Sequence, residues 1–191
     1  IHAATMVNAG VYLLARSLPL FSNVPGWMNA LLIIGGITAF LAATMALVEY
    51  DLKRVLAYST ISQLGYMIFS LGLISGFTAA TFHLMSHAIF KSLLFLGAGA
   101  VIHTVGTQNM YQIGGLKKVM KLTYVAMLTG GLSLAGLIPL SGFWSKDMIL
   151  ATAWENGNYL PLLFMVITAV LTAAYTIRML NLVFWGKSRR T

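Results

Sequence analysis

The chain has 191 residues, of which 59% are hydrophobic and only 8% are charged, whereas soluble domains contain about 25% charged residues. This composition excludes an ordinary soluble protein and indicates an integral membrane protein in contact with a lipid bilayer. The lack of cysteine excludes disulfides, cysteine-bound iron–sulfur clusters and thiolate zinc sites in this chain. The net charge of +8 does not indicate nucleic-acid binding, because the basic residues cluster at the ends of apolar runs, as membrane topology requires.

Six apolar runs succeed one another, and about 20 residues suffice to span a bilayer. They cover residues 1–15, 28–48, 55–74, 78–102, 122–150 and 160–185. Turn-forming or charged stretches such as SLPLFSNVPGW and EYDLKR separate them. The first run lacks an initiator methionine, a charged start and a cleavage site, so we expect a piece of a longer protein, truncated at both ends, rather than a signal peptide. We predict an all-α, polytopic transmembrane helix bundle in which residues 1–191 form one transmembrane region.

The fourth run carries three ionisable residues, His83, His87 and Lys91, in the stretch HLMSHAIFKSLLF. Residues four apart on a helix differ by about 40°, so all three lie within an arc of about 80° and rise about 12 Å along the axis. A charged lysine in the middle of a bilayer costs about 2.5 to 3.5 kcal/mol on insertion scales. A lysine that exchanges a proton beside two histidines is a candidate proton relay.

Other interpretations of this stripe of residues remain. Either histidine alone can serve as a hydrogen-bond partner between helices, and Lys91 can extend along the helix to an interface, although it sits far from both ends. Histidines at i and i+4 can bind zinc, but the metalloprotease pattern requires glutamate where this chain has Leu84. A haem held by His2 and His83 would leave Lys91 unexplained.

The fifth run, residues 122–150, is too long for one straight span and too short for two. A single crossing leaves only Arg16 opposite a group of eight basic residues, which the positive-inside rule places in the cytoplasm. That count predicts about six crossings. The eight are Lys53, Arg54, Lys117, Lys118, Lys121, Lys187, Arg189 and Arg190.

The middle of the fifth run, GLIPLSGFWSKD, predicts a discontinuous helix. Pro139 removes a backbone donor, and Gly136 and Gly142 flank it, so carbonyl groups are freed that need partners inside a membrane. Such breaks lie in protein or line wet cavities, and they mark ion sites in transporters. A simple proline kink or a re-entrant end is the alternative. Lys146 and Asp147, which follow the break, form either an interfacial ion pair or a second titratable station.

The remaining charged positions receive structural interpretations. Lys53 and Arg54 set topology and contact loops. Arg178 either extends to the cytoplasmic face or pairs with an internal acid. His103 ends its helix and is expected to cap it.

Four stretches together resemble the antiporter-like membrane subunits of respiratory complex I: DLKRVLAYSTISQLGYM, FHLMSHAIFKSLLFLGAGAVIH, GGLKK and SGFWSKD. The similarity is to the NADH-quinone oxidoreductase chain L family and its relatives in Mrp-type antiporters, membrane-bound hydrogenases and F420H2 dehydrogenases. It implies that Lys91 is the central lysine of a proton channel, with His83 and His87 as its neighbours. It also implies a terminal station at Lys146 and Asp147 and a further relay position at His2.

The resemblance implies a proton-translocating subunit of an NADH:quinone oxidoreductase-type complex, in a prokaryotic cell membrane, with other membrane subunits as partners. A stand-alone or Mrp-type Na+/H+ antiporter subunit is the alternative. This chain would be the C-terminal half of the subunit, without the upstream half channel and the downstream lateral helix. It would hold no redox cofactor, and NADH, flavin, iron–sulfur clusters and quinone would belong to partner subunits. The chain departs from the family pattern at Lys121, Met148 and the single Pro139, where the family often has proline, an acid and two prolines.

Overall fold

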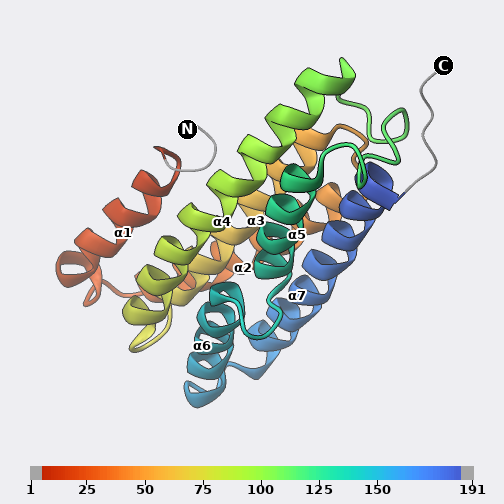
Figure 1. The fold of residues 1–191 in the computed structure, drawn as a ribbon. Coiled ribbons are helices and arrows are strands. Elements are labelled where there is room, and N and C mark those ends of the chain that lie inside the picture. Colours follow the sequence, from red (N-terminus) through yellow and green to blue (C-terminus); the bar gives the residue numbers. More distant parts are fainter. Residues whose placement is uncertain (1–5, 186–191) are drawn as a thin grey trace.

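The computed structural model describes residues 6–185 as a bundle of helices (Figure 1). Within these residues there are seven α-helices and a final π-helix, which confirms the all-α prediction. In chain order they are α1 (Asn8–Phe21), α2 (Trp27–Val48), α3 (Leu52–Leu71), α4 (Gly76–Val105), α5 (Lys121–Ala135), α6 (Ser141–Glu155), α7 (Tyr159–Leu180) and η2 (Asn181–Trp185).

The bundle has two ends, each held by contacts between connections. At the first, which we call the basic end, Asp51 and Asn109 form a bridge between the α2–α3 and α4–α5 connections. The backbone N–H of Lys117 also donates to the carbonyl of Phe184 at a distance of 3.3 Å. At the opposite end, the side chain of Asn156 hydrogen-bonds both the N–H and the carbonyl of Ile74, at 2.9 and 3.1 Å. These contacts fix which connections share an end.

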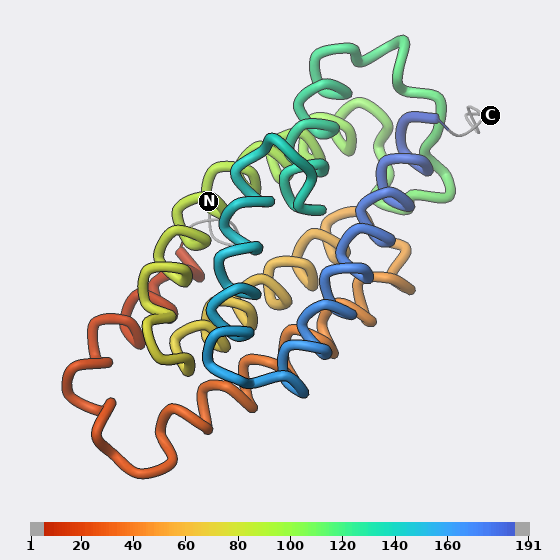
Figure 2. The backbone as a smooth tube through the Cα atoms, turned by 90° about the horizontal axis from the view of Figure 1, so that it is seen from below, coloured from red at the N-terminus to blue at the C-terminus, as the bar shows by residue number. Residues whose placement is uncertain are grey.

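Helices α2, α3, α4 and α7 each pass between these ends, and α5 and α6 together make one further pass, which is the broken one (Figure 2). Helix α1 covers part of another pass, so the arrangement is consistent with the predicted count of about six. Helix α5 starts at the basic end, and α6 continues in the same direction and finishes beside Asn156 at the opposite end. The predicted single crossing with a discontinuous helix is therefore confirmed. The described basic residues of the loops and helix starts gather at the basic end: Lys53, Arg54, Lys117, Lys118 and Lys121. Lys187, Arg189 and Arg190 lie outside the described residues.

Three of the described helices are long and apolar enough to cross a membrane by length and composition: α2, α4, and α7 continued by η2. Helix α3 is different, because it packs against α1, α2, α4, α6 and α7 at the centre of the bundle. Neighbouring helices rather than lipid therefore surround its polar side chains. The buried polar residues on α3 are Ser59, Thr60, Ser62, Gln63 and Ser70.

The first connection differs from the prediction. Residues 17–27 were expected to form a turn, but α1 continues to Phe21 with Pro19 inside it. Pro19 stands in the last turn, where its missing N–H removes only one helical hydrogen bond, so the helix continues for two more residues. The predicted start of this helix at residues 1–5 lies outside the described residues.

Glycine at the crossing of α2 and α3 gives a testable packing prediction. A methyl group at Gly35 would overlap the backbone nitrogen of Phe69 and lie 2.8 Å from the carbonyl oxygen of Gly65. The next residue, Gly36, has only a ring atom of Phe69 at 3.7 Å. We expect Gly35→Ala to destabilise the purified full-length subunit by about 1–3 kcal/mol, because two backbones must separate. Gly36→Ala is the control, and equal melting temperatures for the two variants would contradict this packing.

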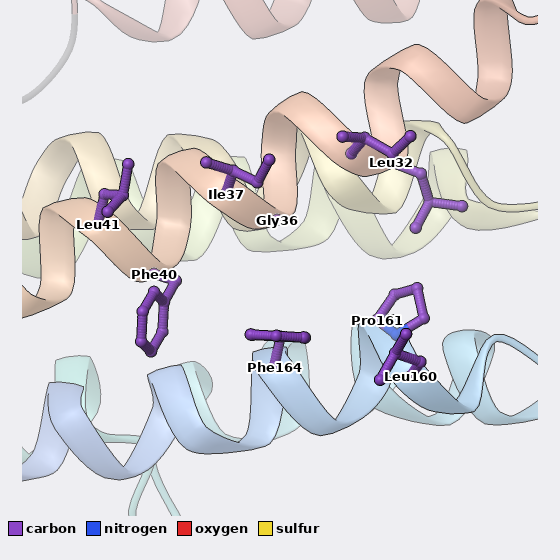
Figure 3. A pocket seen from close by; sticks show the side chains of 9 residues that line it. Leu32, Gly36, Ile37, Phe40, Leu41, Leu160, Pro161 and Phe164 are labelled. Atoms are coloured by element: carbon purple, nitrogen blue, oxygen red, sulfur yellow. The ribbon is translucent and has the colours of Figure 1, made fainter.

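An apolar groove of about 250 Å³ lies on the outer surface between α2 and α7 (Figure 3). Phe40 and Phe164 point toward each other across it, with ring centroids 6.0 Å apart in an edge-to-face arrangement. Every residue that lines the groove is apolar, which suits contact with lipid and offers no group for chemistry. The ionisable residues lie elsewhere, inside the bundle.

Candidate functional site

The predicted polar stripe of α4 is buried inside the bundle. His83, His87 and Lys91 have no exposed surface, and Lys91 faces α3. The Lys91 ammonium Nζ donates to the carbonyl of Leu56 at 3.2 Å and to the hydroxyl of Ser59. Lys91 therefore does not extend to an interface, and its hydrogen bonds are made within the protein.

His83 connects three helices. Its Nε2 lies 3.1 Å from Oε1 of Gln63 on α3, and its Nδ1 lies 2.8 Å from Oγ of Ser145 on α6. Both ring nitrogens are therefore engaged. The imidazole ties α4 to the first turns of α6, immediately after the helix break.

His87 lies between His83 and Lys91 along α4 and is held by packing alone. Its ring centroid is 6.2 Å from that of His83 and 5.4 Å from that of Phe90, which it meets edge to face. Neither nitrogen of His87 has a hydrogen-bond partner among the described residues. A buried imidazole that is fixed in place but not hydrogen-bonded is suited to accept or pass on a proton through water.

The helix break positions Lys146. Gly136, with φ of +82°, ends α5, and its N–H bonds to the carbonyls of Leu132 and Ser133. The next carbonyl, that of Leu134, accepts a 2.6 Å hydrogen bond from Nζ of Lys146 on α6. The predicted freed carbonyl thus has a cationic partner, and the carbonyl end of α5 favours positive charge there. The Lys146 ammonium also lies 5.7 Å from the ring centroid of Tyr66.

We call this set of neighbouring buried groups the polar row. It crosses from α4 to α6 along the face of α3, over the middle of the bundle. Its members are Lys91, Ser59, His87, His83, Gln63, Ser145 and Lys146.

Asp147 and the break loop lie outside the polar row. Consecutive residues on a helix point about 100° apart, and while Lys146 is buried, Asp147 is exposed on the other side of α6. In the loop, Leu137 and Ile138 are 50% and 67% exposed. The break was expected to be buried. Its inner side is buried, where the Leu134 carbonyl bonds Lys146, but its loop is exposed.

The alternative sites find little support in the geometry. His2 lies outside the described residues, and residues 6–185 contain no group of three histidine, cysteine or acidic side chains placed to hold a metal. Both nitrogens of His83 are occupied by protein partners. The absence of a cofactor from the chain stays a prediction.

Charged groups at the basic end have structural contacts. Arg178 extends to that end, where Nη1 donates to the carbonyl of Glu49 at 2.8 Å. Asp51 caps α3 by accepting hydrogen bonds from the N–H groups of Lys53 and Arg54, at 2.8 and 3.1 Å. Bonds from the N–H groups of Asp51 and Tyr50 lower the pKa of Glu49. His103 lies exposed in the last turn of α4.

Sequence reasoning missed four members or neighbours of the row. Ser59, Gln63 and Tyr66 are spaced four and three residues apart inside an apolar run, which places them on one face of α3. That spacing is a signal comparable to the stripe on α4. Ser145 carries no such signal, because serine is common in apolar helices.

Comparisons with known proteins identify the family to which the chain belongs. The family described as "NADH:quinone oxidoreductase/Mrp antiporter, TM" matches residues 1–172. NADH-quinone oxidoreductase subunit L of Rickettsia bellii is 48% identical over 189 residues, which are 99% of this chain and 29% of that protein. A chloroplast NAD(P)H-quinone oxidoreductase subunit 5 from Zygnema circumcarinatum is 54% identical, over 99% of this chain and 28% of that protein.

A solved structure has the same fold. The Mrp complex from Dietzia sp. DQ12-45-1b contains a chain that superposes with a TM-score of 0.88 at 38% identity, covering 94% of this chain and 21% of that one. The chain spans less than a third of the length of these relatives. It is an integral membrane protein that belongs to the NADH:quinone oxidoreductase/Mrp antiporter transmembrane family.

Proposed function

We propose that this chain is part of a proton-translocating membrane subunit of an NADH:quinone oxidoreductase-type complex. The observation that carries the proposal is the polar row, in which two buried lysines on different helices lie on either side of two buried histidines. Relatives named as subunits of NADH- and NAD(P)H-quinone oxidoreductases support NADH as the electron donor of the complex and a quinone as its electron acceptor. In this proposal the region belongs to the C-terminal half of the subunit.

In the proposed mechanism, protons pass from Lys91 to His87 and His83 and then to Lys146. Among the described residues no carboxylate hydrogen-bonds Lys91, so no ion pair locks its ammonium. The His83 and His87 ring centroids are 6.2 Å apart, too far for a direct hydrogen bond between the rings, so in this mechanism a water molecule carries the proton between them. Asp147 would act with Lys146 as the terminal station of this path, and His2 would be a further relay position.

The proposal includes the surroundings of the chain. Other membrane subunits are its partners, and the redox groups belong to the complex and not to this chain. The basic end lies on the cytoplasmic side, because its five described lysines and arginines follow the positive-inside rule. The bacterial relative supports a prokaryotic cell membrane, with a chloroplast membrane as the alternative.

The second candidate is an Mrp-type Na+/H+ antiporter subunit, which the structural match to the Mrp complex favours. The complex containing the full-length subunit, reconstituted in vesicles, separates the two functions. We expect NADH oxidation to drive proton uptake that is independent of sodium. Sodium-driven proton movement in vesicles without any electron donor would contradict the proposed function and favour the antiporter.

A further inference from the structure

Ser145 makes two contacts that involve different hydrogen-bonding roles. Its Oγ lies 2.8 Å from Nδ1 of His83 and 3.3 Å from the carbonyl oxygen of Gly142, one turn earlier on α6. A hydroxyl group has one proton to donate and can also accept. Ser145 can therefore donate to His83, or donate to Gly142 and accept from His83.

These two orientations match two protonation states of His83. When His83 is neutral, its Nε2–H donates to Oε1 of Gln63, and the Ser145 hydroxyl donates to the bare Nδ1. When a proton binds Nδ1, the Ser145 hydroxyl turns to the Gly142 carbonyl and its oxygen accepts the new N–H. Ser145 keeps its own proton throughout, and the Gln63 bond is unchanged.

We propose that Ser145 is a positioning residue whose rotating hydroxyl lets His83 hold either one or two protons without leaving a buried group unpaired. The inference rests on the proposed function, and it adds a residue to which neither the sequence reasoning nor the comparisons gave a role. An unpaired buried donor or acceptor is costly, more so when it is charged. A relay residue that alternates between two states therefore benefits from a neighbour that serves both.

The other titratable groups around His83 set the background of any pH effect. His87 lies on the same helix as His83, and Lys146 follows Ser145 on α6. Tyr66 faces His83 from α3, with the two ring centroids 6.5 Å apart. Removing the Ser145 hydroxyl leaves all of these in place. A change in pH dependence would then report on the hydroxyl itself.

The experiment measures proton pumping and NADH oxidation as a function of pH in vesicles with the assembled complex. Ser145→Ala leaves protonated His83 with a charged, unpaired N–H and leaves neutral His83 with only an unpaired lone pair. The hydrogen bond to protonated His83 is stronger than the one to neutral His83, by an amount that corresponds to roughly a factor of ten in the equilibrium for proton binding. Loss of the hydroxyl therefore disfavours the protonated form, and we expect the alkaline limb of the pumping profile to move to lower pH by about one unit. Ser145→Cys, whose thiol bonds weakly, should shift the profile in the same direction and carries the test if the alanine variant does not assemble.

Ser62→Ala is the matched control, since Ser62 is equally buried on α3 but its hydroxyl donates to the Ala39 carbonyl, away from the row. It should keep the wild-type profile. Wild-type profiles for both Ser145 variants, or a pumping loss that is uniform over pH, would overturn the inference. Lys91→Ala separates this failure from failure of the proposed function, because Lys91→Ala would still abolish pumping if only the role of Ser145 were wrong.

Discussion

Gly142→Ala should separate the two halves of the broken helix and abolish proton pumping. A methyl group at Gly142 would overlap the carbonyl oxygen of Ser133, near the end of α5, and would lie 3.1 Å from its hydroxyl oxygen. The Gly142 N–H also donates to that hydroxyl at 3.2 Å. Since a backbone carbonyl cannot move aside as a flexible side chain would, α6 must shift away from α5.

That shift affects the polar row directly. Lys146 and Ser145 follow Gly142 by one turn, so displacement of α6 lengthens the bonds to the Leu134 carbonyl and to His83. We expect a loss of stability of about 3 kcal/mol, at the upper end for overpacking, measured as a lower melting temperature of the purified complex. Pumping per NADH oxidised should be lost in whatever complex assembles.

Gly99→Ala is the control for this variant. Gly99 lies within α4, and a methyl group there would meet no atom within 4 Å. Because alanine favours helix more than glycine does, this variant should be as stable as the wild type or slightly more so. A Gly142→Ala complex with wild-type stability and pumping would show that α5 and α6 are not in the close contact described here.

The sequence predicted those parts of the site that depend on periodicity along one helix. Spacing of four placed His83, His87 and Lys91 on one face, and that face is buried. Proline and glycine in one short stretch predicted a break with freed carbonyls, and Leu134 and Lys146 realise that prediction. These features depend only on residues close together in the chain, so they can be predicted from the sequence.

The partners of those residues could not be predicted, because they depend on which helices meet and at what height. Gln63 and Ser145 approach His83 from α3 and α6, 20 and 62 residues away in the chain. Nothing in the spacing along α4 selects these two among the polar residues of the other helices. Helix packing decides it.

Asp147 lies on the face of α6 opposite to the polar row. Its adjacency to Lys146 suggested a joint station, but neighbours on a helix point in different directions, and burial of Lys146 leaves Asp147 on the exposed face. Helical geometry alone predicts this separation once α6 is known to extend through both residues. The joint role of the two residues remains a prediction.

Lys91→Ala should abolish proton pumping while the complex still assembles. The Ser59 hydroxyl donates to the Leu56 carbonyl at 2.8 Å, so removal of the lysine leaves neither group without a partner. A group that transfers protons in a reaction contributes about 100-fold or more to its rate. We therefore expect a loss of at least that order in the pumping rate, measured by the quenching of a pH-sensitive dye in vesicles.

Lys91→Arg distinguishes proton exchange from charge alone. Arginine keeps the positive charge but does not release its proton in proteins. If Lys91 acts by exchanging a proton, the arginine variant should pump as poorly as the alanine variant. Lys118→Ala, which removes an exposed lysine at the basic end, should pump normally.

The number of protons translocated per NADH oxidised by the Lys91→Ala complex tests the central claim, that the polar row conducts protons, most directly. Pumping and electron transfer are measured in the same vesicles, so a complex that fails to assemble or to oxidise NADH is recognised at once. The polar row predicts that this ratio collapses while NADH is still oxidised. A wild-type ratio in the Lys91→Ala complex would contradict the claim.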